Sequence, residues 1–169
     1  MKKTLKIQDG KINFFCRRES CEHSCCGPFA GIASSIESID HRPFEEIVLT
    51  GEDYNNIYTH GRSDLIEEGW SEEMQKKYYK MALEPDGTCK AFQNGRCTIH
   101  EYSPTLCKAF PFYFDMFSGL CAICCEGFSD DYWTALKDYQ SYIDAARKMY
   151  EYWVDFYSAP VGESKGEED

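Results

Sequence analysis

The stretch SDDYWTALKDYQSYIDAARKMYEYWVDFY, residues 129–157, carries the longest regular pattern in the chain. Its apolar residues recur every three or four positions, as on the buried face of an amphipathic helix. Ser129 precedes the pattern and is a suitable N-cap. The stretch therefore predicts a long C-terminal helix from about Asp130 that is the main packing element. Its buried side comprises Tyr132, Leu136, Tyr139, Ile143, Ala146, Tyr150, Trp153 and Tyr157, and its polar side comprises Lys137, Asp138, Asp144, Lys148, Glu151 and Asp155.

Two further helices are expected upstream of this stretch. Thr50 is a suitable N-cap with acids after it, which predicts a helix from about Glu52 to Tyr58. Ser71 is followed by acids in the same way, and it precedes a second helix that should end before Pro85. The face of that second helix comprises Trp70, Met74, Tyr78, Met81 and Ala82.

Short elements are predicted to carry several of the cysteines. Residues 6–15 alternate loosely, as in a short strand or an extended arm that brings Cys16 to a site. The pair Asn94-Gly95 joins two short runs and favours a type I′ turn, so that a hairpin carries Cys97. Ser103 and the proline after it should begin a short helix that presents Cys107.

These elements together predict a mainly α fold with one small β-hairpin. A chain of 169 residues suits one domain with its own core. We therefore expect a single cysteine-rich metal-binding domain over residues 1–161 with a long C-terminal amphipathic helix. Residues 162–169 contain four acids and no large apolar side chain, which predicts a disordered acidic tail.

The composition argues against several classes of partner. Lys and Arg total 18 against 29 Asp and Glu, giving a formal charge of −11, which disfavours binding to nucleic acid. No apolar run reaches the roughly 18 residues of a membrane span, and the mean hydropathy is −0.54. Polar residues interrupt the run that follows Met1-Lys2-Lys3, so a signal peptide is not expected. We therefore expect a soluble protein of the cytoplasm.

The ten cysteines fall into three blocks. In a reducing compartment, clustered thiols are more typical of metal ligands than of disulfides. Two alternatives remain, a disulfide framework and buried unreactive cysteines. The candidate metal ligands are Cys16, Cys21, Cys25 and Cys26 in the first block, Cys89, Cys97 and Cys107 in the second, and Cys121, Cys124 and Cys125 in the third.

The spacing of the cysteines does not identify the metal. A structural zinc takes four thiolate or imidazole ligands, and a 4Fe–4S cluster takes four thiolates. Ten cysteines exceed either need, so one centre with accessory thiols and two centres both stay open. His23 and His100 are further candidate ligands. His41 and His60 are candidates of lower rank. A surplus cysteine with a lowered pKa could instead act as a nucleophile.

One segment resembles a known family of small proteins. Residues 97–111, CTIHEYSPTLCKAFP, are similar to the C-x-I-Y-E-x-R-P-x-x-C-R-x-F-P segment of the CxxCxxCC-type zinc- or iron-chelating domain family. The resemblance covers roughly residues 14 to 126 and implies that all the candidate cysteines except Cys125 are metal ligands. His100, Ser103 and Lys108 replace the tyrosine and the two arginines of the family pattern.

The same cysteine signature resembles part of the flagellin lysine N-methylases. The resemblances imply a protein that holds an iron–sulfur cluster or zinc, with a role in electron transfer or as an accessory to a protein partner. The alternative is a cluster-dependent enzyme that methylates a protein substrate. No glycine-rich turn between a strand and a helix, of the kind that binds S-adenosylmethionine, is evident in the chain.

Overall fold

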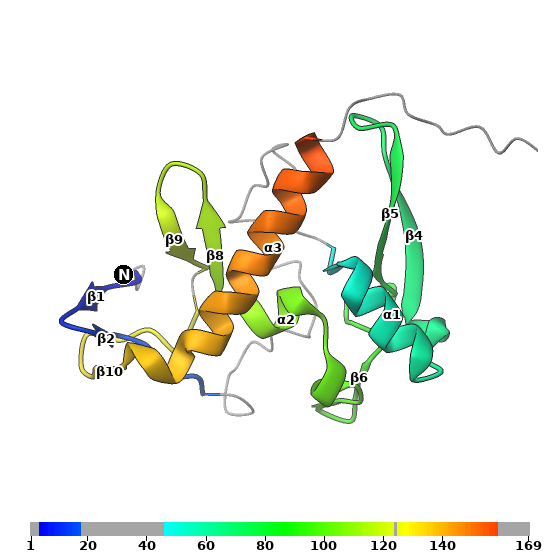
Figure 1. Cartoon of the computed structure of the whole chain (residues 1–169). Coiled ribbons are helices and arrows are strands. Elements are labelled where there is room, and N and C mark those ends of the chain that lie inside the picture. Colours follow the sequence, from blue (N-terminus) through cyan, green and yellow to red (C-terminus); the bar gives the residue numbers. More distant parts are fainter. Residues whose placement is uncertain (1–3, 18–45, 124, 159–169) are drawn as a thin grey trace, which may run out of the picture.

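The computed structural model describes residues 4–17, 46–123 and 125–158 (Figure 1). The structure is 34% helical and 29% strand, and four small sheets accompany the helices. The fold is therefore mixed α/β, and the prediction of a mainly α fold is wrong. The physical reason is that strand pairing overrides local helical patterns at two places described below.

All the strands pair in antiparallel fashion. Two sheets have three strands, in the orders β1-β2-β10 and β3-β5-β4, and two are the hairpins β6-β7 and β8-β9. The strands are β1 (Ile7–Gln8), β2 (Lys11–Ile12), β3 (Val48–Leu49), β4 (Ile66–Ser71), β5 (Lys76–Met81), β6 (Phe92–Gln93), β7 (Arg96–Cys97), β8 (Phe112–Asp115), β9 (Gly119–Ala122) and β10 (Thr134–Ala135).

Three α-helices and three short 3₁₀ helices accompany these strands in the described ranges. Figure 1 shows α3 crossing the view, with the β8–β9 hairpin on one side and α1 with the β4–β5 hairpin on the other. The helices are α1 (Gly51–Thr59), α2 (Thr105–Ala109) and α3 (Gln140–Ser158), and the 3₁₀ helices are η4 (Ser63–Leu65), η5 (His100–Tyr102) and η6 (Leu136–Tyr139).

Two local predictions are confirmed. Helix α1 begins after Thr50, whose side chain accepts a hydrogen bond from the Asp53 N–H, while Asp53 accepts one from the Thr50 N–H. The hairpin β6–β7 turns at Asn94 and Gly95, with φ of 51° and 75°, as a type I′ turn requires. In both cases residues within four positions of one another determine the conformation.

The helix predicted after Ser71 is wrong, because that segment is the β4–β5 hairpin. Ser71 does accept a hydrogen bond from the backbone of Met74, three residues later, but it does so within the hairpin turn. Gln75 has a φ of 50°, which a helix would not allow. The Tyr78 ring covers Gly69 so closely that a Cβ at that glycine would lie 2.3 Å from it.

The first ten residues of the predicted C-terminal helix are not part of α3, and only the last four of them are helical, as the 3₁₀ helix η6. Thr134 and Ala135 form β10, which pairs with Ile12 and Lys11 of β2, and α3 begins only at Gln140. From there the prediction holds, since the residues assigned to the polar side are all exposed. The tail predicted at residues 162–169 lies outside the described residues.

The buried side chains form two apolar clusters. The first lies between the N-terminal strands, β8 and α3, and the second lies between α1, β3 and β5. Helix α2 contributes Ala109 to the first and packs Leu106 and Cys107 against the second, so it connects them. The first cluster comprises Ile12, Phe14, Ala109, Phe112, Phe128, Tyr139, Ala145 and Ala146. The second cluster comprises Ile47, Leu49, Ile57, Leu65, Met81, Cys89, Ala91 and Ile99.

Among the helices in these ranges, none has the length and apolar character that crossing a membrane requires.

Candidate metal centre

Six of the ten candidate cysteines fall in the described part of the chain. They are Cys16, Cys89, Cys97, Cys107, Cys121 and Cys125. The remaining candidates Cys21, Cys25, Cys26 and Cys124, together with His23 and His41, lie outside the described residues. No two of the six described cysteines are joined to each other by a disulfide.

The segment that leads to Cys16 and the segment that follows Cys125 meet at one antiparallel junction. Phe14 forms a β-bridge with Phe128, and the Phe15 N–H donates to the Gly127 carbonyl at 2.9 Å. The two phenylalanine rings of the bridge are buried and lie 4.8 Å apart between centroids. The junction therefore rests on the first apolar cluster, and it brings together chain segments that the sequence places far apart.

A glycine makes this close approach of the two segments feasible. A Cβ at Gly127 would lie 2.5 Å from the Phe14 ring and 2.6 Å from the Phe15 carbonyl oxygen, which is well inside van der Waals contact. The Gly127 N–H also donates to the Cys125 sulfur, with 3.4 Å between nitrogen and sulfur. Hydrogen bonds of this kind stabilise a thiolate and tune a metal bound to it.

Side chains at the junction add polar contacts next to both cysteines. The Arg17 guanidinium lies 3.7 Å from the Glu126 carboxylate, so the residues that follow Cys16 and Cys125 in the sequence form an ion pair. The Cys16 N–H donates to the Tyr139 hydroxyl at 3.3 Å. Both cysteines pack against the first apolar cluster. Both cysteines thus lie against the first apolar cluster, on segments that meet at the junction.

The second block gathers at the other apolar cluster. Cys89 is one of its buried members, and Cys97 and Cys107 pack against it. Burial raises the pKa of the Cys89 thiol, and the nearby Cys97 raises it further. Cys89 therefore stays protonated at neutral pH in the absence of a metal, and a metal ion would have to displace that proton.

Cys121 has different surroundings. It lies opposite Tyr113 in the β8–β9 hairpin, whereas the neighbouring Ala122 packs against the first apolar cluster. Because successive strand residues point to opposite faces, Cys121 points away from that cluster. Burial raises the pKa of the Cys121 thiol, and so does the Asp115 carboxylate.

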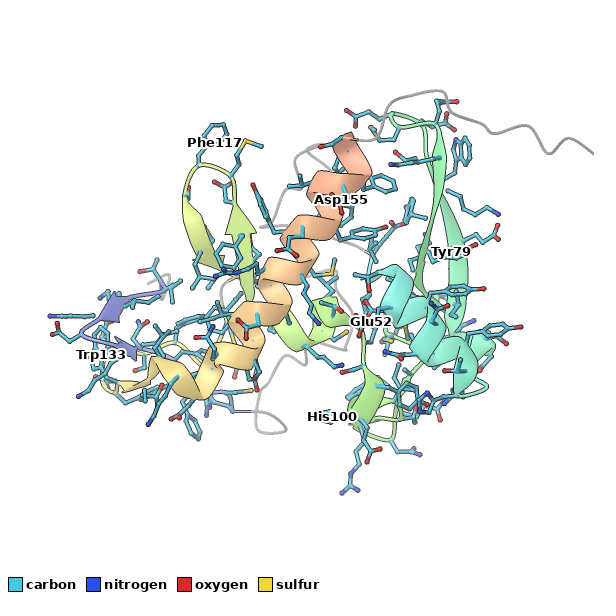
Figure 2. All side chains as sticks on the ribbon, in the orientation of Figure 1. Glu52, Tyr79, His100, Phe117, Trp133 and Asp155 are labelled. Atoms are coloured by element: carbon cyan, nitrogen blue, oxygen red, sulfur yellow. The ribbon has the colours of Figure 1, made fainter. Side chains whose placement is uncertain are left out.

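The structure describes two of the four candidate histidines, His60 and His100. His100 is exposed in η5 at the periphery of the molecule (Figure 2). The His60 ring stacks on Tyr102, with centroids 3.9 Å apart, and its Nδ1 lies 2.7 Å from the Asn56 carbonyl oxygen. His60 therefore serves the end of α1.

The sequence interpretation missed a buried carboxylate beside the second block. Asp53 is 4% exposed, and its Oδ1 accepts hydrogen bonds from both the N–H and the hydroxyl of Thr105, at 3.0 and 2.8 Å. Thr105 begins α2, the helix that carries Cys107. The sequence identifies Asp53 as part of a capping box, but it gives no sign of a partner 52 residues away.

Five of the six described thiols thus form two groups, one on each apolar cluster, and Cys121 belongs to neither group. Within residues 4–17, 46–123 and 125–158, no three Cys, His, Asp or Glu side chains lie close enough to hold a metal ion. A four-ligand site needs further donors, and four candidate cysteines lie outside these ranges.

Comparison with protein-family models, with curated proteins and with solved structures finds no match to this chain.

Proposed function

We propose that the chain is a metal-binding protein that holds an iron–sulfur cluster or zinc through cysteine thiolates. The observation that supports this most is that Cys16 and Cys125 lie on two segments that meet at one junction. A tight glycine contact, a β-bridge and an ion pair fix this junction. Convergence of distant thiols on a fixed backbone is what a tetrahedral thiolate site requires.

The surroundings of the thiols fit such a role. The Gly127 N–H donates to the Cys125 sulfur, and the buried Cys89 lies beside Cys97. Two thiols that lie close together in an apolar environment are weak acids without a metal, but a bound cation stabilises both thiolates at once. An iron–sulfur cluster would supply electron transfer, and zinc would supply structural stability.

The first experiment is purification without oxygen, followed by measurement of iron, zinc and acid-labile sulfide per chain. Iron with matching sulfide supports a cluster, and zinc without sulfide supports a structural or metal-handling site. Cys107→Ser should lower the metal content. The control is Ser71→Ala, which removes a buried hydroxyl in the β4–β5 turn and should leave the metal content unchanged. Wild-type protein that contains neither metal contradicts the proposal.

A further inference from the structure

Helix α2 has a structural weakness at its beginning. It is five residues long, and its N-cap residue Pro104 provides no side-chain hydrogen bond to the N–H groups of the first turn. A helix of this length is not stable on its own, and its first N–H groups need acceptors. The orientation of α2, and of Cys107 within it, therefore depends on contacts from elsewhere in the chain.

Asp53 provides the missing cap. Its Oδ2 accepts from the Thr50 N–H of its own helix at 3.0 Å, while its Oδ1 accepts from the N–H and hydroxyl of Thr105. One carboxylate thus caps the beginnings of both α1 and α2. Both Asp53 and Thr105 are buried, and no Lys or Arg among the described residues forms an ion pair with Asp53.

The geometry points to Asp53 as a positioning residue for the Cys107 thiol, and this inference rests on the proposed function. Cys107 lies two residues after Thr105, and it packs against the same cluster as Cys89 and Cys97. Asp53 does not touch the metal in this account. It fixes the start of the short helix, so that the thiol is held in place before a metal arrives.

The effect is expected on metal affinity. Residues that orient metal ligands without binding the metal typically contribute 10- to 100-fold to affinity. Thr105→Val keeps the shape of the side chain and the backbone contact to Asp53 but removes the hydroxyl, and it should weaken binding by about 10-fold. Asp53→Asn replaces one acceptor oxygen by an amide donor, and it should weaken binding by about 100-fold or prevent folding.

The test is titration of the metal-free full-length chain with cobalt(II) under reducing conditions without oxygen. Thiolate-to-cobalt charge-transfer absorption reports the number of sulfur ligands, and the titration midpoint reports the affinity. We expect Thr105→Val to lower the affinity and to reduce the charge-transfer intensity toward that of Cys107→Ser. Ser71→Ala is the control for the loss of a buried hydroxyl, and it should match the wild type in both readouts.

The possible results separate this inference from the proposed function. Wild-type chain without thiolate-to-cobalt absorption overturns the role of Asp53. It also overturns the proposed function if the protein purified without oxygen contains neither iron nor zinc. Loss of intensity in Cys107→Ser with wild-type affinity and intensity in Thr105→Val overturns the role of Asp53 alone. Equal weakening in Thr105→Val and in Ser71→Ala also overturns it, because the effect would then follow general stability.

Discussion

Gly127→Ala is the most informative single change in this protein, because Gly127 lies where the segments that carry Cys16 and Cys125 meet. The added Cβ would lie 2.5 Å from the Phe14 ring and 2.6 Å from the Phe15 carbonyl oxygen, against 3.4 Å for the near edge of ordinary contact. One segment must therefore move by roughly 0.8 to 0.9 Å, the difference between these distances. The Phe14 ring cannot move easily, because the centroids of three other aromatic rings lie within 5.3 Å of its own centroid.

The expected cost follows from these contacts. Overpacking a tight site costs about 1–3 kcal/mol, and loss of the hydrogen bond from the Phe15 N–H to the Gly127 carbonyl adds about 1 kcal/mol. We therefore expect a loss of about 2–4 kcal/mol in the free energy of unfolding, measured by urea unfolding of the metal-free chain. For a chain of this size the Tm should fall by roughly 4 to 16 °C. The metal content of the purified protein should fall as well.

Gly51→Ala is the matched control. Gly51 lies in the first turn of α1, and a Cβ there would meet nothing within 4 Å, so the same substitution should be neutral or slightly stabilising. Surface substitutions typically change the free energy of unfolding by no more than about 0.5 kcal/mol. If the free energies of unfolding of Gly127→Ala and Gly51→Ala differ by less than this, the close junction of the two segments is refuted.

Three further predictions concern single side chains. Burial raises the pKa of the Cys89 thiol, so the unfolded chain loses this proton before the folded protein does. The resulting stability is complete below the unfolded-state pKa of about 8.5 and is lost as the pH rises through the folded-state pKa. The free energy of unfolding of the metal-free wild type, measured with urea, should accordingly fall more steeply with rising alkaline pH than that of Cys89→Ala. Equal slopes against pH would contradict the buried thiol. Gly95→Ala places a side chain at a φ of 75° and should lower the free energy of unfolding by about 1–2 kcal/mol; an unchanged urea midpoint would argue against the type I′ turn. Tyr139→Phe removes the acceptor of the Cys16 N–H and should cost about 0.5–1.5 kcal/mol in thermal unfolding, whereas an unchanged Tm would show that this contact contributes nothing.

Parts of the fold that depend on neighbouring residues can be predicted from the sequence. Thr50 and Asp53 cap α1 over three residues, and Asn94-Gly95 determines its own turn through backbone conformation. The spacing of apolar residues every three or four positions also predicts which face of α3 is exposed after Gln140.

Parts that depend on distant partners cannot be predicted in this way. Spacing of three and four residues after Trp70 fits a helix, yet residues 66–71 and 76–81 pair as strands around a turn, and β5 also pairs with the more distant strand β3. Thr134 falls within a helical pattern but pairs with Ile12, which lies at the other end of the chain. In both segments tertiary pairing outweighs a weak local preference.

The candidate metal centre likewise combines features that the sequence predicts with contacts that only the structure shows. The sequence predicts which residues are candidate ligands, but it does not show that the segments of Cys16 and Cys125 meet or that Asp53 reaches Thr105. Those contacts arise from Gly127 and from a buried carboxylate that serves two helices. A capping residue and a glycine are common enough that neither suggests such a role without the structure.

X-ray absorption at the edge of the bound metal, on protein purified without oxygen, tests the central claim most directly. The claim is that converging cysteine thiolates hold the metal. The account predicts a first shell made mainly of sulfur, at about 2.3 Å if the metal is zinc. A first shell made only of nitrogen and oxygen, at about 2.0–2.2 Å for zinc, would contradict it.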